Sequence, residues 1–148
     1  MRVGIRRWRA PVVVVATVGR TLLLVWDVSA AQEEPWRRLL QELSYARCEE
    51  KYVESRRRLG VSAESVWLVP KRSGGGIAVV YLEVLDPERA LGELAASEAP
   101  FDSWYSRAMR QLFGFDLARL TRAASCELLF AWRDGGPGER EAPNKLMT

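Results

Sequence analysis

Ile77-Ala-Val-Val-Tyr-Leu-Glu-Val-Leu85 is the stretch of sequence that decides the fold, because it is the clearest strand in the chain. Almost every residue in it is apolar, which is typical of a central strand that is covered on both faces. Asp86-Pro87 marks the turn that closes this strand. The other predicted elements are arranged around it.

A second strand, over residues 64–69, precedes the central strand. The connection between them, Lys71-Arg-Ser-Gly-Gly-Gly76, is rich in glycine. Glycine-rich runs can cradle phosphate, but this one lacks the lysine and the serine or threonine of a phosphate-binding loop and does not lead into a helix. The run is therefore predicted to be a hairpin loop.

Toward the N-terminus, a short apolar strand over residues 22–28 is followed by a long, charged helix. Ser29 is suited to cap the start of this helix, and Glu33 and Glu34 favour its first turn. Gly60 is a natural residue to follow a last helical turn. The sequence therefore predicts that the helix runs from about residue 30 to residue 59.

The apolar face of this helix does not run its whole length. Trp36 opens a face that, at about 3.6 residues per turn, continues into charged residues. These are Arg47, Glu50 and Glu54. Three interpretations remain open: the helix is interrupted near residue 44, its apolar stripe changes partner, or the charged residues lie under the sheet. In the last case they line a polar pocket, with Tyr52 near its mouth, in which opposite charges satisfy each other.

Two helices, over residues 87–96 and about 101–113, and a last strand, over residues 127–132, follow the central strand. Asp102 or Ser103 is expected to cap the second helix, and Gly114 to end it. The order β-α-β-β-α-β predicts an α+β, ferredoxin-like fold: a four-stranded antiparallel sheet with helices on one face. Residues 1–20 are assigned to an extension, 21–133 to the domain and 134–148 to a disordered tail.

Composition excludes several classes of function. The chain of 148 residues has 48% hydrophobic residues, a net charge of +3 and no histidine. Without histidine, Ser-His-Asp triads, haem ligation by histidine and histidine-containing metal sites are excluded, and we expect no metal and no cofactor. Several arginines lie before residue 12, outside the predicted core, so we expect no nucleic-acid partner.

The N-terminal segment allows two interpretations. Arginines followed by an apolar run and Val28-Ser-Ala30 resemble a signal peptide with its cleavage site. We favour the other interpretation, in which residues 22–28 form the first strand, because cleavage would remove an element that the sheet needs. No apolar run reaches the ~18 residues that span a bilayer, so no membrane partner is expected. The two cysteines lack a paired spacing, which favours a reduced, cytoplasmic protein over one with a disulfide.

Four segments together resemble a group of small uncharacterised bacterial proteins related to the dimeric α+β barrel superfamily. They are residues 33–60, Glu64-Ser-Val-Trp-Leu68, Val80-Tyr-Leu-Glu83 and Phe101-Asp-Ser-Trp-Tyr105. The resemblance covers roughly residues 21–132. It implies a ferredoxin-like protomer that pairs sheet to sheet as a homodimer, and it supplies no activity.

The wider superfamily suggests where a ligand would bind. It includes cofactor-independent monooxygenases, small cyclases and ligand-binding proteins, and the residues to consider are Arg47, Trp67, Tyr81 and Trp104. The first hypothesis is a dimer that binds a small molecule or serves as an association module. The alternative is a cofactor-independent enzyme of the monooxygenase or cyclase type, in which Glu50 or Glu54 acts as a general acid or base after burial raises its pKa.

Overall fold

The computed structural model describes residues 13–120, 124, 125 and 129. Its elements follow one another as β1 (Val14–Val18), β2 (Thr21–Val28), α1 (Ala30–Glu42), α2 (Ala46–Arg58), β3 (Val61–Pro70), β4 (Gly76–Val84), α3 (Pro87–Ala96), α4 (Pro100–Phe113), the short 3-10 helix η1 (Leu117–Arg119) and β5 (Ala124–Ser125).

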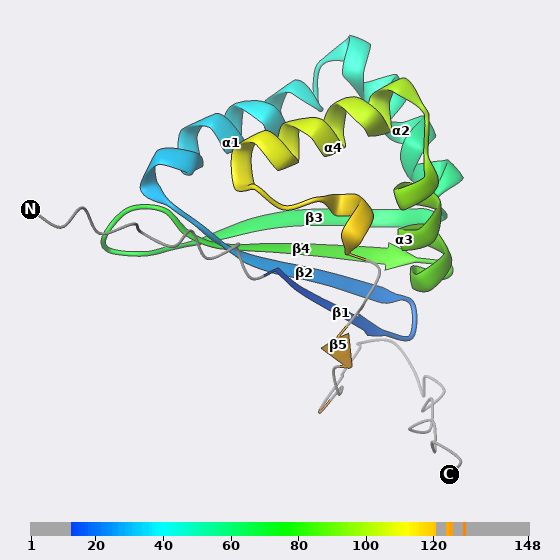
Figure 1. The fold of residues 1–148 in the computed structure, drawn as a ribbon, viewed down its shortest axis with the longest axis horizontal. Coiled ribbons are helices and arrows are strands. Elements are labelled where there is room, and N and C mark those ends of the chain that lie inside the picture. Colours follow the sequence, from blue (N-terminus) through cyan, green and yellow to red (C-terminus); the bar gives the residue numbers. More distant parts are fainter. Residues whose placement is uncertain (1–12, 121–123, 126–128, 130–148) are drawn as a thin grey trace, which may run out of the picture.

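The strands form one sheet in the order β3-β4-β2-β1-β5 (Figure 1). The first four are antiparallel to their neighbours, and the two-residue β5 runs parallel to β1. The register pairs Leu23 of β2 with Tyr81 of β4, and Trp67 of β3 with Val79 of β4. β4 is therefore a central strand, as its apolar sequence predicts.

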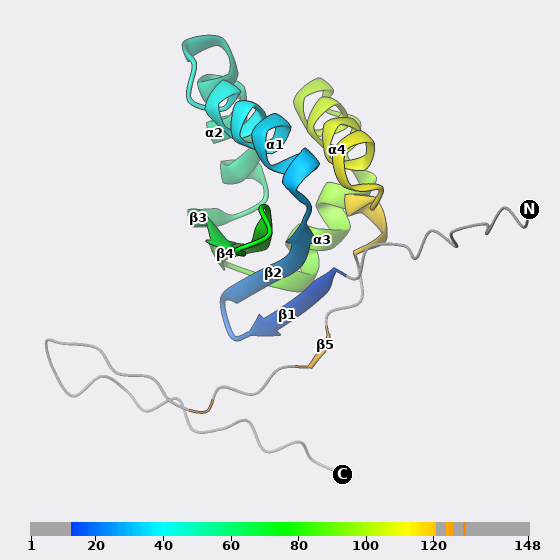
Figure 2. The ribbon, with the colours of Figure 1, turned by 90° about the vertical axis from the view of Figure 1, so that its left-hand side faces the viewer.

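All four long helices lie on the same side of the sheet (Figures 1 and 2). The prediction of an α+β fold, with an antiparallel four-stranded sheet and helices on one face, is confirmed at this level. The ferredoxin-like order of strands is not confirmed. β2 pairs with β4 on one side and with β1 on the other, so the sheet has no place beside β2 for the strand predicted at residues 127–132.

The sheet begins earlier in the chain than the sequence predicted. Val14–Val18 falls in the segment assigned to an extension, yet it forms β1 and pairs along its length with β2 through the turn at Gly19. A β-hairpin needs only two apolar runs and a residue that accepts a positive φ, and Gly19, at φ 54°, supplies the latter. The predicted strand at 127–132, apart from Leu129, and the predicted tail at 134–148 lie outside the described residues.

The order of elements repeats within the chain. β1 and β2 form a hairpin that is followed by α1 and α2, and β3 and β4 form a second hairpin that is followed by α3 and α4. The inner strands of the two hairpins, β2 and β4, lie side by side and antiparallel at the centre of the sheet. The sequence itself contains no recognisable repeat, so this symmetry is visible only in the topology.

The long predicted helix is two helices, which supports the first of the three interpretations. α1 ends at Glu42 and α2 begins at Ala46. The start is as predicted: the Ser29 side chain accepts from the Gln32 amide, and Gln32 returns a bond to the Ser29 amide. Because α2 starts anew, the face it turns toward the core is not a continuation of the Trp36 face.

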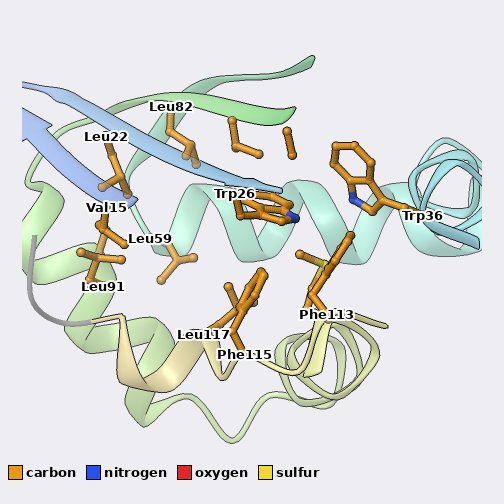
Figure 3. Close-up of a cluster of buried hydrophobic side chains, with 14 of the residues drawn as sticks. Val15, Leu22, Trp26, Trp36, Leu59, Leu82, Leu91, Phe113, Phe115 and Leu117 are labelled. Atoms are coloured by element: carbon orange, nitrogen blue, oxygen red, sulfur yellow. The ribbon is translucent and has the colours of Figure 1, made fainter. Parts of the chain in front are cut away.

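The core lies between the helices and the sheet, and aromatic rings fill its centre (Figure 3). The Trp26 ring makes edge-to-face contacts with Trp36, Phe113 and Phe115 at centroid distances of 5.4–5.6 Å. Such contacts add to the free energy gained by burying the rings. The Trp26 indole Nε1 is buried and has no hydrogen-bond partner within the described chain. These rings belong to the core and line no open site.

Candidate functional site

The structure does not bring the predicted site residues together. Glu50 and Glu54 are exposed on the outward side of α2, where a shallow hollow is lined by residues of that helix alone. The Arg47 side chain lies outside the described part of the structure. The pocket between helix and sheet that these residues were predicted to line is therefore contradicted for Glu50 and Glu54. The physical reason is the break between α1 and α2, which rotates the charged side of α2 away from the core.

Tyr52 points inward instead and belongs to a polar cluster between α2 and β3. The Glu64 carboxylate accepts hydrogen bonds from the Tyr52 hydroxyl and from Arg56 Nε, both at 2.6 Å. The Arg56 guanidinium lies over the Tyr52 ring, 4.8 Å from its centroid, and 5.7 Å from the ring centre of Tyr105 of α4. Only 12% of the Arg56 side chain and 11% of the Glu64 side chain are exposed. The cluster ties α2 to the edge strand and to α4.

Burial controls the protonation of this cluster. Burial, followed by the charge of Glu64, raises the pKa of the Tyr52 hydroxyl well above its usual value of 10. Burial raises the pKa of Tyr105 to about 12. Burial acts to lower the pKa of Arg56, but the charge and hydrogen bonds of Glu64 outweigh it and raise that pKa. At neutral pH both tyrosines are therefore neutral and Arg56 is charged, so none of them is poised to accept a proton.

A second buried cluster surrounds Asp102, whose side chain is 2% exposed. Its carboxylate accepts hydrogen bonds from Ser55 Oγ and Ser97 Oγ, both at 2.5 Å, and forms an ion pair with Arg58. The sequence predicted Asp102 as a helix cap, but α4 begins at Pro100 and Asp102 lies in its first turn, facing α2. Every partner of this carboxylate restrains it, so the cluster joins α2 to α4 and offers no free acid or base.

A small apolar cavity adjoins the first cluster. Its volume is about 70 Å³, and it lies between β2 and β4 on one side and α3, α4 and η1 on the other. Leu82, Leu91 and Met109 are typical of its lining, with Arg56 and Glu64 at its polar wall. Pockets that hold metabolites usually measure about 300–1,000 Å³. The cavity has room for one or two water molecules rather than for a metabolite.

The remaining candidates lie in two places. Trp104 is on the helix side, half-buried, with its ring centre 5.8 Å from that of Phe101. Trp67 and Tyr81 are neighbours on the open face of the sheet, with ring centres 6.5 Å apart. Trp67 is 52% exposed and Val69, beside it, is 53% exposed. The open face therefore carries large apolar side chains that no described element covers.

Sequence reasoning missed the two residues at the centres of the clusters, Arg56 and Asp102. Arg56 was detectable in part, because it lies four residues after Tyr52 and three before Leu59, on the same side of the helix. No local pattern could reveal that its partner is Glu64 or that Ser55 meets Asp102, 47 residues away. Those contacts exist only once α2, β3 and α4 have packed.

Other kinds of site find no support in the part of the chain that the structure describes. It contains no group of three acidic, cysteine or histidine side chains that could hold a metal ion. None of its helices has the length and apolar character to cross a membrane. No family model, curated protein or solved structure matches this chain. The link to dimeric α+β barrel proteins therefore stays a prediction.

Proposed function

We propose that this protein is an association module in which two copies pair through the open faces of their sheets. The observation that carries the proposal is the composition of β4, which is apolar on both sides. Ala78, Val80 and Leu82 are buried under the helices, while Ile77 and Val79 point to the other side, where nothing in the described chain covers them. A strand of this composition is typical of a sheet with a cover on both faces.

The apolar surface continues across the neighbouring strands. The register places Leu23 and Val25 of β2 beside Tyr81 and Val79 of β4, and Trp67 of β3 on the far side of Val79. Because side chains alternate along a strand, all of them share the open face. Large exposed apolar patches of this kind mark surfaces that bind another molecule.

The size of the surface fits a second copy. Four strands about 4.8 Å apart and about eight residues long cover roughly 500 Å². Two such faces would bury about 1,000 Å² between them, near the lower bound for a specific interface. A flat apolar sheet can match a copy of itself about a two-fold axis, with the sheets about 10 Å apart. The proposal agrees with the homodimer that the sequence resemblance implies.

Neither binding of a metabolite nor catalysis has comparable support. The cavity of about 70 Å³ is too small for a metabolite, and Glu50 and Glu54, the carboxylates assigned to acid–base work, are exposed on α2. A general acid or base needs burial to raise its pKa toward neutrality. The association module is therefore the function that we retain.

Substitution of Trp67 tests this proposal. We expect Trp67→Lys to halve the mass of the assembly in sedimentation velocity over a wide range of concentration, because it places a charge in the centre of the apolar face. Tyr45→Lys is the matched control: Tyr45 is 68% exposed but lies in the connection between α1 and α2, away from the sheet. A native chain that is monomeric at every concentration, or a Trp67→Lys variant with the native mass, would contradict the proposal.

A further inference from the structure

The two edges of the sheet differ. At one edge β1 has β5 beside it, whereas at the other edge β3 has no neighbour on its outer side among the described residues. A register shift between Val61 and Ala63 and the proline at position 70 limit both ends of β3. Between them, residues 63–69 contain no proline and no lysine, the residues that commonly protect an edge strand. This stretch is long enough to pair with another strand.

The helix above this edge contributes a second surface. α2 lies over β3 at the same margin of the molecule, and both Tyr52 and Arg56 reach Glu64 of that strand (Figure 2). Since Ser55 and Arg58 of α2 bind Asp102 of α4, the side of α2 opposite to them faces outward beyond β3. The outward side is the one that carries the shallow hollow.

Charges on the outward side of α2 are arranged symmetrically. Glu49, Val53 and Arg57 follow one another at intervals of four residues, so they form one row along the helix. Glu49 lies one turn before Val53, and Arg57 lies one turn after it. Neither charged side chain takes part in an ion pair within the described chain. A helix with this row is complementary to an antiparallel copy of itself.

We propose that a second copy of this chain docks along this edge, with β3 antiparallel to β3 and α2 antiparallel to α2. The two-fold axis would pass near Val53, so that Glu49 of each copy faces Arg57 of the other. Pairing of the two edge strands satisfies backbone groups that otherwise face water, and the helices add two ion pairs and an apolar contact. The result is one continuous sheet with all helices on the same side.

This interface is independent of the pairing through the open face and goes beyond it. The axis of the edge pairing stands perpendicular to the sheet, whereas the axis of face-to-face pairing lies parallel to it. Two perpendicular two-fold axes that intersect close an assembly at four copies. If both interfaces form, the assembly consists of two long sheets packed face to face.

Charge exchange tests the edge interface. Glu49→Arg alone, or Arg57→Glu alone, sets like charges against each other and is expected to raise the dissociation constant of this interface at least about tenfold. The double variant E49R/R57E restores opposite charges and is expected to recover native assembly. An equimolar mixture of the two single variants is expected to recover it also, because the mixed pair has two attractive contacts. Native mass spectrometry and sedimentation velocity report the outcome.

Matched controls separate this contact from general effects of charge. Glu88→Arg in the first turn of α3 makes the same change at the start of another helix, and Arg107→Glu does so on α4; both residues are exposed. Neither is expected to change the mass. The proposal is overturned if Glu49→Arg and Arg57→Glu leave assembly intact, or if the double variant fails to recover it while remaining folded by circular dichroism. A native assembly that only Trp67→Lys dissociates would retain the face-to-face pairing and refute the edge interface.

Discussion

The two faces of the sheet carry side chains of similar apolar character but meet different surroundings. On one face, Trp26 of β2 and Leu82 of β4 are 3% and 7% exposed under the helices. On the other, Trp67 of β3 and Ile77 of β4 are 52% and 36% exposed. In most antiparallel sheets with one solvated face, the strands alternate apolar and polar residues. The absence of that alternation in β4 is what makes the open face informative, because it indicates a cover that the chain's described part does not supply.

The sharpest test of this difference compares a tryptophan on each face. Trp26→Ala removes a ring from the aromatic cluster, and we expect it to lower the free energy of unfolding by about 3–5 kcal/mol. Trp67→Ala removes a half-exposed ring and is expected to cost less than about 1 kcal/mol in the monomer. Urea denaturation at a concentration low enough to dissociate the assembly measures both. Equal losses would contradict the distinction between the faces.

A carboxylate on each face extends the comparison. Glu64→Gln removes the charge that neutralises Arg56 beneath α2, and we expect a loss of about 3 kcal/mol because a buried guanidinium is left unpaired. Glu83→Gln changes a residue on the open face whose Oε1 accepts a hydrogen bond from the Tyr81 hydroxyl, and it is expected to cost less than about 1 kcal/mol. Denaturant unfolding of the two variants side by side would show whether the helix-covered cluster holds the fold.

The tyrosines of the covered side predict a dependence on pH. The folded pKa of Tyr105, about 12, lies above the value near 10 in the unfolded chain. The unfolded chain therefore loses this proton first, so the stability is fully present below pH 10 and falls as the pH rises from about 10 to 12. Tyr105→Phe is expected to make this fall less steep, and Tyr45→Phe, at an exposed position, is expected to leave it unchanged. Thermal unfolding across this range of pH would measure the slope, and an unchanged slope in Tyr105→Phe would count against the assignment.

The smallest effect is expected at the carboxylate that the sequence assigned to catalysis. Glu54 is exposed on α2, so Glu54→Gln is expected to change the free energy of unfolding by less than about 0.5 kcal/mol. Denaturant unfolding measures it, with Glu64→Gln as the contrasting variant. A loss comparable to that of Glu64→Gln would mean that Glu54 faces the core after all.

Much of the local structure could be predicted from the sequence. The strands near residues 22–28, 64–69 and 77–85 and the helix start at Ser29 are found where the pattern placed them, because apolar runs and caps act over a few residues. Gly60 and Gly114 follow the ends of α2 and α4 with positive φ, as predicted. The candidate site was predicted less well, since it required the helix face to continue unchanged through residues 43–45.

The sequence by itself determined that this chain builds an α+β domain with apolar strands, and that histidine chemistry is absent from it. Only the tertiary structure decided that β1 takes the place beside β2, that Arg56 meets Glu64 and that Asp102 meets Ser55. Periodicity and capping depend on neighbours within a turn or two, so they can be read along the chain. Strand order and buried ion pairs depend on residues far apart in sequence, and these become neighbours only when packing offsets the cost of burying them.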